Sequence, residues 1–184
     1  MNKEYNFAAI SGSLRKGSFN TMVVRTLQKL APSNIHIEHL SIAEVPFYNF
    51  DLHGKQFPEA VEVLNDKIVS ADAVILVTPE YNYSVPGVLK NMIDIVSRSP
   101  KKPFNMKPVG ILGATPGLLG TTRAQYHLRQ IMVAMNAYVM NKPEIMISQA
   151  NVKFDNEGNL QDEKTKQYLE NFIASLAAFS DVFK

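Results

Sequence analysis

Short apolar runs alternate along the whole chain with longer segments in which apolar residues recur every three or four positions. The short runs have the length and β-branched content of buried strands, whereas the longer segments have the period of amphipathic helices. Five runs are predicted strands: Phe7–Ile10, Ile35–Leu40, Ala73–Val77, Val109–Leu112 and Glu144–Ile147. Strands that alternate with helices are typical of a parallel sheet, so we expect a doubly wound α/β fold.

Helical periodicity fills most of the intervals between these strands and the segment after the last one. The predicted helices are Phe19–Leu30, Val61–Ile68, Val88–Val96, Thr122–Asn136 and Leu169–Leu176. The segment Val152–Leu160 has turn-forming residues at its centre and is expected to form a turn or small hairpin. No repeat or linker interrupts the pattern, so residues 1–184 are expected to form one domain. Right-handed crossovers would bring the loops after the strands to one edge, where open α/β sheets bind ligands.

Composition removes several classes of function. The chain has 19 Lys and Arg against 17 Asp and Glu, and these charges are scattered, so we expect no nucleic-acid partner. It has no Cys, and its 4 His show no metal-ligand arrangement, so we expect no metal site and assign any redox chemistry to a bound cofactor. No apolar run approaches the length of about 18 residues that spans a bilayer, so we expect a cytoplasmic protein without a membrane partner.

The loop after the first predicted strand is rich in hydrogen-bond donors. It reads SGSLRKGSFN over residues 11–20 and opens the first predicted helix. Unpaired amides at a helix start, with serine hydroxyls and Arg15 beside them, are suited to a phosphate. The loop lacks the P-loop lysine and the dinucleotide glycine pattern, so the terminal monophosphate of FMN in a flavodoxin-like sheet fits it better. The alternative is that Ser18 only caps the helix while Arg15 and Lys16 lie in solvent.

Two further loops could hold a flat ring. TPEYNYSVPG over residues 78–87 is pinned between a strand and a helix, so its amides could orient an isoalloxazine. Tyr81 and Tyr83 would flank the ring, unless they pack into the core or a subunit interface. Glu80 is the only carboxylate of this loop and is expected to be solvated or to cap a helix. GATPGLLG over residues 113–120 would border the same ring or form a plain turn.

Together, the motifs GSxRxxSxN at 12–20 and TPEYNxSxPGxLKNxID at 78–94 resemble the NADPH-dependent FMN reductase family. QYHLRQ at 125–130 and MNKPE at 140–144 are similar to its bacterial chromate and quinone reductase branch. The resemblance implies a flavodoxin-like, doubly wound five-stranded parallel sheet with helices on both faces and bound FMN. The expected cofactor-binding residues are Ser11, Ser13, Leu14, Arg15, Ser18, Phe19, Asn20, Pro79, Glu80, Tyr81, Asn82, Tyr83, Ser84, Thr115 and Gly117.

The same resemblance implies an oxidoreductase. It would pass hydride from NADPH or NADH through FMN, in a ping-pong sequence, to quinones, free flavin, azo compounds or metal oxyanions such as chromate. It also implies a homodimer or homotetramer. Because the flavin would perform the chemistry, we expect no catalytic side chain. The alternatives are a flavodoxin-type electron carrier, which is usually strongly acidic whereas this chain carries a net charge of +2, and a flavin-loaded regulatory module.

Overall fold

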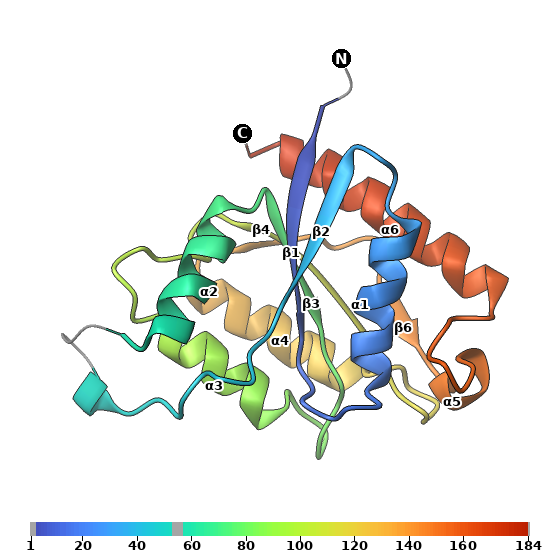
Figure 1. The fold of residues 1–184 in the computed structure, drawn as a ribbon, viewed down its shortest axis with the longest axis horizontal. Coiled ribbons are helices and arrows are strands. Elements are labelled where there is room, and N and C mark those ends of the chain that lie inside the picture. The colour runs from blue at the N-terminus through green and yellow to red at the C-terminus, as the bar shows by residue number, and fades with distance from the viewer. Residues whose placement is uncertain (1–2, 53–56, 184) are drawn as a thin grey trace.

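The computed structural model describes residues 3–52 and 57–183, which form a parallel sheet with helices on both faces (Figure 1). Its strands pair in the order β2-β1-β3-β4-β5, and β6 also pairs with β4. The chain therefore starts inside the sheet and winds towards both edges, which confirms the doubly wound prediction. The strands are β1 Tyr5–Ser11, β2 Ile35–Leu40, β3 Ala73–Val77, β4 Pro108–Ala114, β5 Tyr138–Val139 and β6 Ile145–Ile147.

The helices divide between the two faces of the sheet. One apolar cluster joins α1, α5 and α6 to one face, and a second cluster joins α2, α3 and α4 to the other. In the described ranges, no helix is long and apolar enough to cross a lipid bilayer. The helices are α1 Phe19–Leu30, α2 Glu59–Ser70, α3 Gly87–Val96, α4 Thr122–Ala134, α5 Ala150–Lys153 and α6 Glu163–Asp181, with a 3₁₀ turn, η1, at Phe50–Leu52.

The burial of the strands explains why they could be predicted from the sequence. Phe7 and Ala9 of β1 face α1 and α6, whereas Ala8 and Ile10 face the opposite core. Every residue of β3 is fully buried, because helices cover both sides of this central strand. A strand that is buried on both faces reads as a continuous apolar run instead of an alternating one.

The far edge of the sheet differs from the prediction of five strands. Two short strands share this edge, since β5 pairs with Pro108 and Val109 while β6 pairs with β4 from Leu112 onwards. The sequence missed β5 because its two residues are only half-buried and carry no periodic pattern. The expected hairpin at Val152–Leu160 is shorter than predicted, because α5 takes its first residues and only Phe154 and Leu160 form a bridge.

Gly110 lets α6 approach the sheet closely. A Cβ at this position would lie 2.5 Å from Cζ of Phe172, a fully buried ring of α6. Replacing Gly110 with alanine is therefore expected to lower the free energy of unfolding by about 1 to 3 kcal/mol through overpacking, measured by urea denaturation. Gly87→Ala is the matched control, because a Cβ there meets nothing within 4 Å. A Gly110→Ala protein as stable as this control would contradict the close approach.

Candidate functional site

Three loops meet where β1, β3 and β4 end. We call them loop 1 (12–18), loop 2 (78–86) and loop 3 (115–121); the loops after β1 and β3 lie side by side at the bottom of Figure 1. Ser13 Oγ of loop 1 lies 3.4 Å from the Tyr81 hydroxyl of loop 2. Gly12 allows this approach, because a Cβ there would lie 3.2 Å from Cδ of Pro79. The structure thus brings the two predicted binding loops together.

Loop 1 presents amide groups that the protein does not use. Ser18 caps α1, since its hydroxyl accepts a hydrogen bond from the Thr21 amide at 3.4 Å, as the simpler interpretation of this residue expected. Arg15 and Lys16 are exposed, and the Arg15 guanidinium lies 5.6 Å from the Phe19 ring centroid. A group with several acceptor oxygens, such as the FMN phosphate, fits this donor set. Within the described residues, no protein acceptor is paired with the amides of Leu14, Lys16, Gly17, Phe19 and Asn20.

Two predicted phosphate ligands are engaged with the protein itself. Both polar atoms of the buried Asn20 side chain bond the main chain of Ala114: Nδ2 donates to its carbonyl at 3.0 Å, and Oδ1 accepts from its amide at 2.9 Å. Ser11 Oγ accepts a hydrogen bond from the Thr21 hydroxyl at 3.0 Å. These side chains join the start of α1 to the ends of β1 and β4 and so position loop 1, while their predicted contact with the phosphate stays a prediction.

Loop 2 contains a tight turn. Tyr81 and Ser84 exchange main-chain hydrogen bonds of 3.1 and 3.0 Å, and the residues between them, Asn82 and Tyr83, have φ of 48° and 68°. Two consecutive positive φ values are the mark of a type I′ turn, which asparagine tolerates well. Tyr81 and Tyr83 are 49% and 68% exposed, so the alternative in which they pack into the core is wrong.

Loop 2 is fastened to the first turns of α4. The largely buried carboxylate of Glu80 accepts hydrogen bonds from the Arg123 and Ala124 amides at 3.0 and 3.2 Å and from Arg123 Nε at 2.7 Å. The Arg123 guanidinium lies 3.5 Å from the Tyr83 ring centroid, and Ser84 Oγ shares a 3.1 Å hydrogen bond with His127 Nδ1. Glu80 is therefore a helix cap, one of the two roles expected for it.

Loop 3 packs closely behind loop 2. A Cβ on Gly113, just before loop 3, would collide with the carbonyl oxygen of Thr78. Thr115 donates its amide to Ile147 O at 3.0 Å, and its hydroxyl accepts the Gly117 amide at 3.3 Å. Gly117 itself is exposed. Loop 3 therefore offers an open backbone at the same edge as the two tyrosines.

The loop motifs did not reveal the contribution of α4. Arg123 and His127 hold loop 2 from a helix that begins after loop 3, and neither was predicted to belong to the site. Only the fold brings the start of α4 next to loop 2. Sequence spacing carries no signal for such a contact between distant segments.

Comparison with known proteins shows which family the chain belongs to. The family model for NADPH-dependent FMN reductases matches residues 5–152. The chain belongs to this family. It is 46% identical to an NAD(P)H-dependent FMN reductase of Pseudomonas aeruginosa, with 96% of this chain and 95% of the relative covered. It is 47% identical to a quinone reductase of Escherichia coli, with 98% and 96% covered.

A solved structure agrees with these relatives. FerB, a flavoenzyme NAD(P)H:acceptor oxidoreductase of Paracoccus denitrificans, superimposes with a TM-score of 0.88 at 34% identity, covering 97% of this chain and 98% of FerB. The flavodoxin-like fold and the family inferred from the loop motifs are confirmed. The expected enzyme class, an oxidoreductase that uses FMN and NAD(P)H, is confirmed with them. The single domain and the cytoplasmic location stay predictions.

Proposed function

We propose that this chain reduces quinones and free flavins with electrons from NAD(P)H, and that loops 1 to 3 hold its FMN. The observation that carries the proposal is the set of unpartnered amides in loop 1, which faces loop 2 across the contact between Ser13 and Tyr81. The names of the relatives in Pseudomonas aeruginosa and Escherichia coli support the donor and the acceptors. The net charge of +2 favours this function over that of an electron carrier.

Each loop has a distinct task in this proposal. Loop 1 holds the phosphate through its amides, the Ser13 and Ser18 hydroxyls and Arg15. The main chain of residues 79–84 orients the flavin ring, Tyr81 and Tyr83 shield one side of it, and Thr115 and Gly117 border it. FMN, when bound, accepts hydride from NAD(P)H and passes electrons to the oxidant. The protein binds and orients, so no side chain has to act as an acid or a base.

The proposal extends to acceptors and assembly. Flat quinones and azo compounds, and oxyanions such as chromate, would be able to reach an open flavin ring without specific hydrogen bonds. NAD(P)H and the acceptor would react in turn, in a ping-pong sequence. The exposed Tyr81 and Tyr83 of loop 2 and Leu118 and Leu119 of loop 3 support an interface in a homodimer or homotetramer. Light scattering tests the assembly. Oxidation of NADPH and NADH with benzoquinone, azo dye or chromate tests the acceptors, and a colourless protein that binds no added FMN would contradict the proposal.

Arg15 gives a direct test of the phosphate position. Replacing Arg15 with alanine is expected to weaken FMN binding by about 1 to 3 kcal/mol, because one charge-assisted hydrogen bond is lost. The fold should persist, since the Arg15 side chain is exposed. Fluorescence titration of the apoprotein with FMN measures the change. Arg98→Ala, which removes another exposed arginine next to Tyr48, is the control; equal FMN affinity in both variants would place the phosphate elsewhere.

A further inference from the structure

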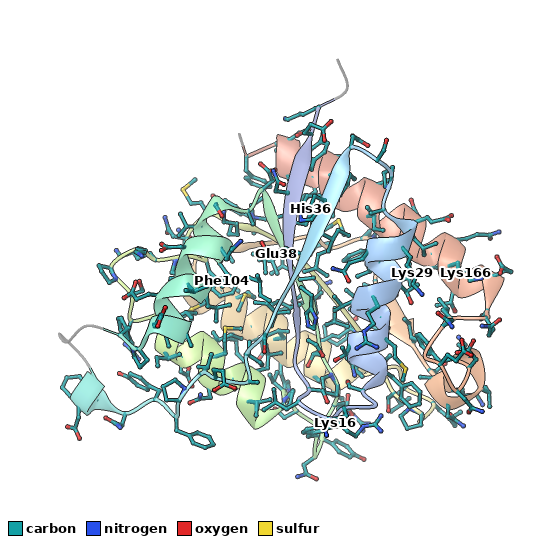
Figure 2. All side chains as sticks on the ribbon, viewed as in Figure 1. Lys16, Lys29, His36, Glu38, Phe104 and Lys166 are labelled. Atoms are coloured by element: carbon teal, nitrogen blue, oxygen red, sulfur yellow. The ribbon has the colours of Figure 1, made fainter. Side chains whose placement is uncertain are left out.

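A cleft lies on the β2 side of loop 1 and is lined in part by the residues of that loop. Its volume is about 400 Å³, and it runs between the first half of α1 and the segment His39–Ala43 at the end of β2. Ser13 and Arg15 of loop 1 also line it, so the cleft adjoins the proposed phosphate position. Lys16, another lining residue, lies with loop 1 at the lower edge of the sheet in Figure 2.

The cleft is positively charged. Arg15, Lys16 and Arg25 line it, and no lining residue is an aspartate or glutamate. Across the described part of the chain, none of these three cations forms an ion pair. Uncompensated cations around one concavity attract an anionic ligand, and arginine and lysine are the usual partners of a phosphate.

The adjoining cleft has the opposite character. It lies between β2 and α2, has a volume of about 470 Å³ and contains three carboxylates, Glu38, Glu44 and Glu59, with Lys67 as its one lysine. Lys67 is already paired with Glu38 at 2.9 Å. An anion is therefore repelled from this second cleft and confined to the side of Lys16 and Arg25.

The three cations of the cleft are spread over a longer distance than a single bound phosphate could span. Arg25 lies seven residues beyond Ser18, which at helical rise is about 10 Å along α1. A phosphate on the loop 1 amides would therefore leave Arg25 for a second anionic group. Burial and the Arg25 guanidinium lower the pKa of His39, and its ring adds a hydrogen-bonding group to the wall of the cleft.

We propose that this cleft binds the 2′-phosphate on the adenosine of NADPH, through Lys16 and Arg25. The inference rests on the proposed function, which puts FMN phosphate on loop 1 and the hydride donor over the ring at loops 2 and 3. The adenosine end of an extended dinucleotide then passes loop 1 on its way out. Its 2′-phosphate is the one group that distinguishes NADPH from NADH, so the cleft makes the enzyme prefer NADPH.

The test uses the FMN-loaded enzyme and adenosine 2′,5′-bisphosphate as probe. In calorimetric titrations, the wild type is expected to bind the bisphosphate more tightly than 5′-AMP or inorganic phosphate, in competition with NADPH. Arg25→Ala and Lys16→Ala are each expected to raise the Kd of the bisphosphate and the KM for NADPH about tenfold, the effect of one lost charge-assisted hydrogen bond. The KM for NADH should change less than about twofold, because NADH lacks the phosphate.

Lys29→Ala is the matched control. It removes a lysine from the same helix, but Lys29 does not line the cleft, lies well away from Lys16 in Figure 2 and donates to Asn159 Oδ1 at 2.8 Å. All three measured constants should stay at their wild-type values in this variant. A fall in the KM selectivity for NADPH in Arg25→Ala and Lys16→Ala, but not in Lys29→Ala, would support the proposal.

Four results would overturn the inference. They are an equal rise of both KM values in Arg25→Ala, an unchanged bisphosphate Kd, equal binding of inorganic phosphate, and loss of FMN from Arg25→Ala, which would make the cleft part of the flavin site. Failure of the proposed function has a different signature. In that case the wild type itself would bind no FMN, and the bisphosphate titration of the flavin-free protein would still decide whether the cleft recognises the ligand.

Discussion

Replacing Asn20 with alanine is expected to lower the free energy of unfolding by about 2 to 5 kcal/mol, the largest stability loss that we predict for the site. The substitution would leave the amide and carbonyl of the buried Ala114 without the two partners that Asn20 now provides. A buried main-chain group without a partner costs about 1 to 3 kcal/mol, and here there are two. Urea denaturation of the flavin-free protein measures the loss without a contribution from ligand binding.

The control for Asn20 is a second asparagine with the same bonding pattern. Asn91 donates to Pro46 O and accepts from the Tyr48 amide, both at 2.9 Å, but it is partly exposed. Because water can replace the lost partners there, Asn91→Ala should cost less than Asn20→Ala. Equal losses would mean that burial at Ala114 does not govern the effect. An Asn20→Ala protein of unchanged stability and strongly reduced FMN affinity would mean that Asn20 acts as the phosphate ligand predicted from the sequence and does not stabilise the end of β4.

Asn20 also shows where sequence reasoning reaches its limit. The residue stands in a donor-rich motif, which predicted a phosphate contact that stays a prediction but gave no sign of the bonds to the main chain of Ala114. Its actual hydrogen-bond partner, Ala114, is 94 positions away along the chain. The pattern around a residue states which groups it can bond, whereas the fold decides which partner is within reach.

The strands were easier to predict because a buried strand consists largely of apolar residues, which can be recognised in the sequence. β2 and β3 begin and end at the predicted residues, Ile35–Leu40 and Ala73–Val77. Both are apolar on at least one face, and the helices between them keep a helical period. β5 gave no such signal, since a two-residue strand is defined by its pairing with β4 and not by its own residues.

Loops 1 to 3 were singled out in the sequence by their chemistry, whereas the contacts that stiffen loop 2 were not predicted. The sequence indicated that residues 78–87 are held between a strand and a helix, but it did not predict the type I′ turn at Asn82 and Tyr83. Glu80 was expected to be solvated or to cap a helix. The helix that it caps, α4, begins more than forty residues later, so the fold had to supply the partner.

Glu80 is therefore expected to be a positioning residue whose loss slows turnover. α4 begins after Thr121, whose side chain makes no capping hydrogen bond, so the Glu80 carboxylate satisfies the first amides of the helix. Its negative charge also lies at the positive end of the helix dipole. Glu80→Ala is expected to cost about 2 to 4 kcal/mol of stability and to free loop 2 from α4. A displacement of the ring by even 1 Å would lower kcat about 10- to 100-fold.

Two further variants separate the cap from the ion pair. Glu80→Gln keeps an oxygen that accepts from the helix amides, so it should retain more activity than Glu80→Ala. Arg123→Ala removes the ion pair and the contact with Tyr83 but leaves both main-chain amides for Glu80, so it should have the mildest effect. Steady-state kcat, visible circular dichroism of the bound flavin and urea denaturation rank the three variants. If Arg123→Ala were as damaging as Glu80→Ala, the ion pair and not the helix cap would fix loop 2.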